Sequence, residues 1–120
     1  MEFDQFTVSL LVLRPDAPKL EEEAAAELQD AHQAHIADLH ESGHLLAAGP
    51  LSDPKFRGLS ILRADVDEAR RLKENDPAVQ AGRFSVKVMP WTVPAGAMSF
   101  ARTRFPRSVA EAMGQSPSRQ

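Results

Sequence analysis

Four stretches of the chain combine alternating side chains with β-branched, aromatic or leucine residues, which is the pattern of β-strands. The first, FDQFTVSLLVL, covers residues 3–13 and ends before Arg14-Pro15, where the proline ring removes a hydrogen-bond donor. In the last, Phe84, Val86 and Val88 share one face, because successive side chains of a strand point to opposite sides. The predicted strands are residues 3–13, 44–51, 56–63 and 83–91.

Helical periodicity fills the intervals between these strands. A long helix is predicted over residues 18–42, with Asp16 as its cap and Gly43 as its left-handed terminating residue. A second helix, over residues 66–75, is expected to be capped by Asp65 or Asp67 and to end at Asp76-Pro77, and a short helical piece covers residues 78–81. The order β-α-β-β-α-β predicts an α+β protein with a ferredoxin-like protomer.

Two helices cover only one face of a four-stranded sheet. We expect the other face to carry alternate residues of the first and last strands: Thr7, Ser9, Leu11, Leu13, Ser85, Lys87, Met89 and Trp91. That surface is too apolar to remain in water. The simplest cover is the same face of a second copy, so the sequence predicts a homodimer.

Length and composition restrict the class of protein. The 120 residues suffice for one domain, and the absence of cysteine excludes disulfide and thiolate chemistry. The acidic start MEFDQF and the lack of a long apolar run predict a cytoplasmic protein without a membrane partner. Residues 1–100 hold 10 basic and 16 acidic side chains, which disfavours nucleic acid as a partner. Residues 101–120 hold four arginines and one glutamate, so this basic tail is expected to be solvated or docked on the acidic body.

The candidate chemistry centres on two histidines of the long helix. A helical projection at about 100° per residue places His32 and His35 in the same apolar stripe as Leu28 and Leu39. Such a histidine is either a hydrogen-bonded core residue or an acid–base group. The i, i+3 spacing also permits a shared metal ion, but no inward carboxylate completes a ligand set, and no metal site is predicted.

Three further residues are candidates for binding a small molecule. Gly49 and Pro50 form a turn that also lets a substrate approach the main chain. Lys87 is a candidate anchor for an anionic substrate, with a paired interface charge as the alternative.

Several short motifs, in their order and spacing, resemble one family. They are His35 with Leu39, Gly43-His44-Leu45-Leu46, Gly49-Pro50, Gly58, Glu68-Ala69, Asp76-Pro77, Ala81-Gly82 and Met89-Pro90-Trp91. Between about residue 5 and residue 92 the chain resembles the YCII-related proteins of the dimeric α+β barrel superfamily. The resemblance divides the chain into a YCII-related domain, residues 1–92, and a C-terminal extension, residues 93–120. The extension is expected to hold a short helix at about 107–113 and a disordered end, residues 114–120.

The resemblance implies a dimer whose sheets pack face to face and an active site made of a histidine–aspartate pair. By motif the pair falls on His35 and Asp76, while His32 has no counterpart. Some relatives are linked to the breakdown of chlorinated hydroxyquinones. The function expected from this resemblance is a small cofactor-free enzyme using acid–base chemistry, by isomerisation, lyase chemistry or dehydrochlorination, on a small cyclic or aromatic metabolite. One alternative is a module that binds a small ligand, with His35–Asp76 as a structural bond; a cofactor-free oxygenase is another.

Overall fold

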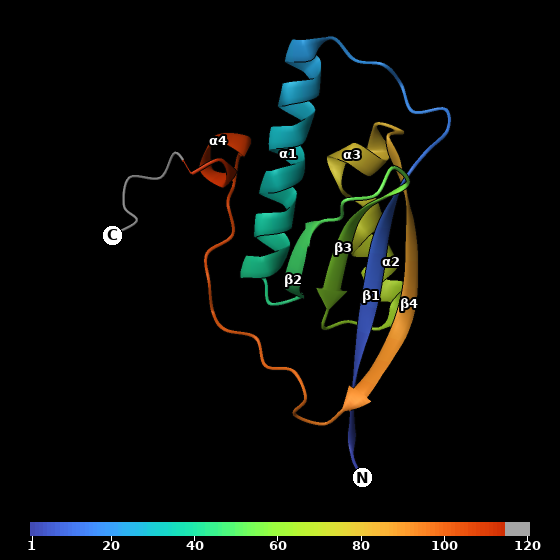
Figure 1. Ribbon diagram of the computed structural model, residues 1–120, viewed down its shortest axis with the longest axis vertical. Coiled ribbons are helices and arrows are strands. Elements are labelled where there is room, and N and C mark those ends of the chain that lie inside the picture. Colours follow the sequence, from blue (N-terminus) through green and yellow to red (C-terminus); the bar gives the residue numbers. More distant parts are fainter. Residues whose placement is uncertain (115–120) are drawn as a thin grey trace.

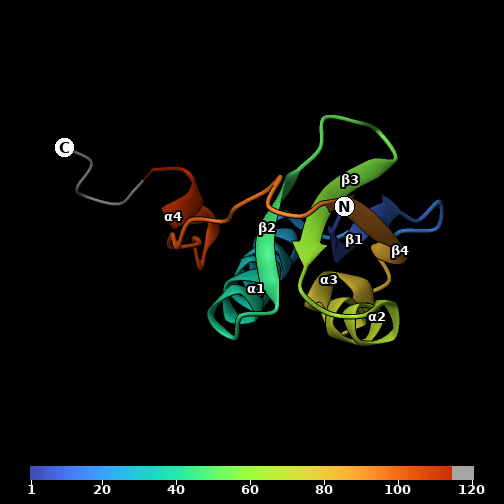
Figure 2. The ribbon, with the colours of Figure 1, turned by 90° about the horizontal axis from the view of Figure 1, so that it is seen from below.

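A computed structural model of the protein describes residues 1–114, which form two layers. One layer is an antiparallel sheet with strand order β2-β3-β1-β4, and the other contains α1, α2 and α3 on a single face of that sheet (Figures 1 and 2). The elements are β1 (Phe3–Leu13), α1 (Glu22–Glu41), β2 (Leu45–Pro50), β3 (Phe56–Leu62), α2 (Val66–Glu74), α3 (Pro77–Gln80), β4 (Phe84–Pro94) and α4 (Val109–Ala112). The predicted α+β, ferredoxin-like order of elements is confirmed.

The first helix starts later than the sequence pattern predicts. Asp16 does not cap it, because its carboxylate accepts hydrogen bonds from the Arg14 guanidinium in the loop that precedes the helix. Helix α1 begins at Glu22 and its N-cap residue, Glu21, makes no side-chain capping bond. At the other end Gly43 follows with a φ of 88°, the left-handed conformation that terminates a helix without a Cβ penalty.

The next two helices begin at aspartates that cap them. Asp65 accepts a hydrogen bond from the Glu68 amide at 2.8 Å and so starts α2. Asp76 accepts from the Ala78 amide at 2.8 Å and so starts α3 immediately after α2 has ended. Asp76 therefore both stops one helix and starts the next.

The faces of β1 are the reverse of those predicted. In the ladder with β4, Ser9 lies opposite Val88 and Leu11 opposite Val86, so these residues share one face. That face is the one under the helices, where Leu11 packs with Leu28 and Val79. The open face carries Phe6, Val8, Leu10 and Val12 of β1, the β3 residues opposite them, Leu59 and Ile61, and Ser85, Lys87, Met89 and Trp91 of β4.

A main-chain carbonyl beside the start of α2 accounts for part of this reversal. Thr7 and Ser9, at 2% and 1% exposed, look like solvent-facing residues in the sequence but lie in the interior. The Thr7 hydroxyl donates to the carbonyl oxygen of Ala64 at 2.6 Å, in the turn between β3 and α2. A buried hydroxyl with such a partner costs little, so the helix-covered face tolerates small polar residues.

Two apolar clusters hold the helices against the sheet. One contains Leu39, Leu45, Leu62 and Ala69, and joins α1 and α2 to the β2–β3 edge of the sheet. The other contains Leu11, Ala78 and Phe84, and joins α3 to β1 and β4.

Residues 95–114 wrap around the domain after β4. The segment runs from the end of β4 to the outer side of α1, where α4 lies (Figures 1 and 2). Arg107 forms ion pairs with Asp38 and Glu41 of α1, and the Val109 amide donates to Asp30 at 2.8 Å. The basic segment is thus docked on the acidic helix, one of its two predicted states. The predicted disordered end falls mostly on residues 115–120, which lie outside the described residues.

Within residues 1–114, the structure contains no helix long and apolar enough to cross a membrane.

We expect Leu62→Ala to lower the free energy of unfolding by about 2–5 kcal/mol, because it opens a cavity where the side chain is 0% exposed. Chemical denaturation measures this loss. The neighbouring exposed residue gives the control: Arg63→Ala should change stability by less than about 0.5 kcal/mol. Similar small losses for both variants would contradict the placement of Leu62 in the core.

Candidate active site

A buried histidine–aspartate pair joins the first helix to the start of α3. His32 of α1 is 8% exposed and Asp76 is 0% exposed. Nδ1 of His32 lies 2.6 Å from Oδ2 of Asp76, while Oδ1 of the same carboxylate accepts the Ala78 amide. An ionised carboxylate only accepts hydrogen bonds, so Nδ1 carries the proton and Nε2 is the unprotonated nitrogen of the neutral ring.

The predicted pairing of His35 with Asp76 is wrong. Nε2 of His35 lies 3.0 Å from the carbonyl oxygen of Leu72, a contact that ties α1 to α2. The two histidines are three residues apart on one helix face, and the position of α3 decides which of them meets Asp76. His32, which has no counterpart in the family motif, holds that position. The catalytic role of His35 stays a prediction that no contact tests.

Opposing influences act on the pKa of Asp76. Burial raises it, whereas the hydrogen bond and charge of His32, the Ala78 amide and the charge of Lys73 lower it, and the net result is a pKa below the usual value. The carboxylate is therefore ionised at neutral pH and stays available as the acceptor for His32.

A buried lysine completes a polar cluster beside the pair. Lys73, in the last turn of α2, is 0% exposed, and its Nζ donates to the hydroxyl oxygen of Ser60 at 3.2 Å. Burial lowers the pKa of Lys73, and the nearby charge of Asp76 opposes that shift. Ser9 lies directly across the ladder from Ser60, and its Oγ is the one fully buried side-chain polar atom without a hydrogen-bond partner in residues 1–114.

This cluster borders a cleft of about 540 Å³ between α1, the sheet and the C-terminal segment. His32 lines the cleft, and its Nε2 has no hydrogen-bond partner within residues 1–114. Gly49 and Pro50, two of the predicted substrate-binding residues, also line it; their role in binding stays a prediction. The cleft is large enough for a single aromatic ring with its substituents.

The C-terminal segment forms one wall of this cleft through Phe105, Pro106 and Ala112. The Phe105 ring stacks on His40 of α1 with centroids 3.8 Å apart, and Nε2 of His40 lies 2.9 Å from the Thr103 carbonyl oxygen. Farther back along the segment, the Phe100 ring packs edge-on against Phe6, at 5.6 Å between centroids. A segment outside the YCII-like stretch of the sequence thus closes the candidate site.

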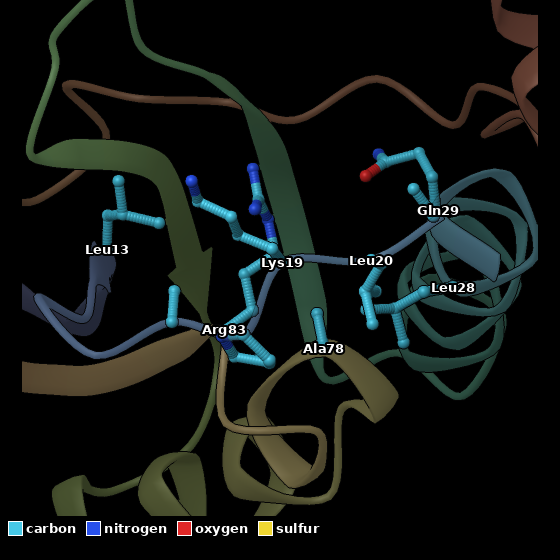
Figure 3. Close-up of a pocket in the computed structure, with 10 residues that line it drawn as sticks. Leu13, Lys19, Leu20, Leu28, Gln29, Ala78 and Arg83 are labelled. Carbon is cyan, nitrogen blue, oxygen red and sulfur yellow. The ribbon is translucent and has the colours of Figure 1, made fainter. Parts of the chain in front are cut away.

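A second cleft of about 540 Å³ lies at the other end of α1, under the β1–α1 loop. Figure 3 shows Lys19, Leu28, Gln29 and Arg83 around it. Gln29 and Arg83 line both clefts, so the two are neighbours. No histidine or carboxylate lines the second cleft within residues 1–114, which makes it the weaker candidate for acid–base chemistry.

Lys87, the third predicted substrate-binding residue, lies elsewhere. Its side chain is on the open face of β4, opposite Leu10, and it does not line the cleft of His32. Its role as an anchor for an anionic substrate stays a prediction. The described residues, 1–114, contain no group of three or more histidine and acidic side chains placed to hold a metal ion.

The comparison with known protein families gives a match over most of the chain. A family model for the YCII-related domain matches residues 8–92. The chain belongs to the YCII-related family. No curated protein matches the sequence of this YCII-related protein. Among solved structures it is similar to 5-chloro-2-hydroxyhydroquinone dehydrochlorinase from Burkholderia phenoliruptrix AC1100, in a complex with 2,5-dihydroxybenzoquinone. The two chains are 22% identical with a TM-score of 0.55, over 72% of this chain and 92% of the other.

The sequence contains a pattern that indicates the burial of Lys73, a residue that was not among the predicted site residues. Val66, Ala69 and Lys73 follow the i, i+3, i+7 spacing of a core-facing helix stripe, and Lys73 occupies its last position. A charged residue in an apolar stripe is rarely buried without a partner. Arg57 and Arg83, which also line the cleft, had no comparable signal.

We expect Asp76→Asn to remove part of the acid sensitivity of folding. Because the folded-state pKa of Asp76 is lowered, its contribution to stability is complete above the unfolded value, about 3.9, and is lost as pH falls below it. Urea unfolding between about pH 7 and pH 3 measures this. The variant should lose about 1–3 kcal/mol at neutral pH and decline less on acidification than the wild type.

Asp67→Asn is the matched control, since it neutralises an exposed carboxylate on α2. A wild type and an Asp76→Asn variant that lose stability in parallel as the pH falls would contradict the lowered pKa of Asp76.

Proposed function

We propose that this YCII-related protein is a small enzyme that moves protons on a small cyclic or aromatic metabolite. His32 is the general acid–base group, and Asp76 orients it. The observation that carries the proposal is the arrangement of the two ring nitrogens: Nδ1 is held by a buried carboxylate, while Nε2 has no partner within residues 1–114 and the residue lines a cleft. A histidine held in this way has one defined tautomer, with its second ring nitrogen directed to accept a proton.

The proposed step uses groups already in place. Nε2 of neutral His32 accepts a proton from a hydroxyl or a carbon of the ligand, and the Asp76 carboxylate stabilises the resulting imidazolium through the Nδ1–H bond. The imidazolium then returns the proton to another atom of the ligand or to water. Isomerisation and elimination of hydrogen chloride both begin with such a proton removal.

Two observations support a small cyclic substrate. The cleft has a volume of about 540 Å³ and mixes apolar side chains such as Leu11, Ile36 and Phe105 with a few polar ones. The similar dehydrochlorinase is described with a substituted benzoquinone bound. At 22% identity that similarity concerns the fold, so the size and lining of the cleft carry the proposed substrate class.

His32→Asn should lower turnover by about 100-fold or more, since general acid–base catalysis contributes on that scale. The assay monitors chloride release from chlorinated hydroxyquinones and, by NMR in D₂O, exchange of ring protons in hydroxylated aromatic compounds. Asp76→Asn should reduce turnover in the same assays, because it removes the charge that stabilises the imidazolium.

His35→Asn is the matched control, three residues away on the same helix and bonded to a main-chain carbonyl. It should keep turnover within a few-fold of wild type. Loss of turnover in His35→Asn alone would instead support the pair implied by the family motif. A folded protein that binds these compounds and turns none of them over would favour the non-catalytic ligand-binding module.

We also propose a homodimer formed by the open face of the sheet. The face carries Val8, Leu10, Leu59, Ile61 and Met89, and Trp91 beside them is 39% exposed. No helix within residues 1–114 covers this surface (Figure 2). A continuous apolar sheet face of this kind is characteristic of an interface between protein chains.

Sedimentation equilibrium should give about twice the chain mass of 13.2 kDa. Leu10→Lys should shift the protein to the mass of one chain, because it places a charge at the centre of the interface. Met113→Lys, at a residue that is 72% exposed near the C-terminus, is the control and should leave the mass unchanged. A wild-type mass of one chain would exclude the dimer.

A further inference from the structure

The cleft beside His32 has a charge pattern unlike that of the whole chain. The protein carries a net charge of −3. Within residues 1–114, however, the charged side chains that line the cleft are Arg57, Lys73 and Arg83, and no aspartate or glutamate lines it. A cleft lined by charges of one sign concentrates ligands of the opposite sign.

The two arginines have no acidic partner within the described part of the chain. Neither Arg57 nor Arg83 forms an ion pair in residues 1–114, whereas Arg14, Arg104 and Arg107 all do. The Arg83 guanidinium lies over the Phe84 ring at 5.0 Å, a contact that leaves its N–H groups free. Guanidinium groups bind carboxylate and other oxyanions through paired N–H donors.

A third basic residue, Lys73, is connected to the cleft through the hydroxyl group of Ser60. Lys73 is fully buried, so it does not reach a ligand directly, but its Nζ donates to the Ser60 oxygen. Because Ser60 Oγ accepts that bond, its own O–H is left to donate, and Ser60 also lines the cleft. The Lys73 charge therefore acts on the cleft through Ser60.

The charge of the cluster gives a further reason for an anion. Asp76 and Lys73 are both 0% exposed, and the charge of each acts on the pKa of the other. When His32 accepts a proton, the cluster gains one positive charge and the ligand that supplied the proton becomes anionic. An oxyanion in the cleft compensates that charge.

We propose that the cleft is a binding site for a small organic oxyanion, a carboxylate or an enolate, held by Arg57 and Arg83 and oriented by the Ser60 hydroxyl with Lys73 behind it. The inference rests on the proposed function only in placing the ligand in the same cleft. The anion site requires charge-selective binding but does not depend on turnover. The anion site and the proposed enzyme function can therefore fail separately.

Benzoate and benzamide form a pair of probes with nearly the same shape and different charge. We expect benzoate, added at millimolar concentrations, to shift the backbone amide NMR signals of Gly49, Gly58 and Ser60, which line the cleft. Benzoate should bind at least about tenfold more tightly than benzamide, because charge-assisted hydrogen bonds form with the anion alone. Arg83→Gln and Arg57→Gln should each weaken benzoate several-fold and leave benzamide unchanged.

Lys73→Met tests the charge behind Ser60 with a side chain of similar length. It should reduce the preference for benzoate over benzamide, an effect that a loss of packing alone would not produce. Arg63→Gln, at an exposed position directly after β3, and Arg70→Met, at an exposed position of α2, are the controls and should change neither affinity. The arginine variants keep the test valid if Lys73→Met does not fold.

Three results would overturn the inference: no binding of either probe, equal affinity for both, or shifts confined to surface arginines outside the cleft. Charge-selective binding together with unchanged turnover in His32→Asn would uphold the anion site and reject the proposed catalytic role of His32. Loss of turnover in His32→Asn with equal affinity for the two probes would support the catalytic role of His32 and reject the anion site.

Discussion

The burial of one carboxylate organises the centre of this protein. Asp76 meets the imidazole of His32 from α1, caps α3 through the Ala78 amide and faces the charge of Lys73 from α2. An unpaired carboxylate in this position would cost several kcal/mol, so the three helices are held by the requirement that the charge be satisfied. The same requirement fixes the tautomer of His32. In this site the fold and the proposed proton transfer depend on one interaction.

Local sequence signals were sufficient for the order of elements and for most of their ends. Gly43 terminates α1 and Asp65 starts α2 as their types and positions predict. The faces of β4 were also predictable, because Phe84, Val86 and Val88 alternate with polar residues. The faces of β1 were not, since both sets of alternating residues contain large apolar side chains. The buried face is the one that carries Thr7, whose hydroxyl donates to the carbonyl oxygen of Ala64, 57 residues away in the sequence.

The site was harder to predict than the fold for a similar reason. His32 and His35 occupy the same stripe of one helix, and only the packing of α2 and α3 separates their roles. The family motif indicated His35, whereas the contacts select His32. Asp76, which the family motif gave as the partner of His35, instead contacts His32. Of the cleft's arginines, Arg57 lies on β3 and Arg83 directly precedes β4, and no local pattern brings them together.

The outer wall of the cleft has a different origin from its floor. Phe105 and Pro106 follow the residues 8–92 that match the family, whereas His32, Ser60, Lys73 and Asp76 lie within them. Changes in the length or sequence of the terminal segment therefore alter the shape of the cleft without replacing His32 or Asp76. The outline of the cleft and the buried His32–Asp76 pair are thus encoded by separate stretches of the chain, so one can change in sequence while the other is kept.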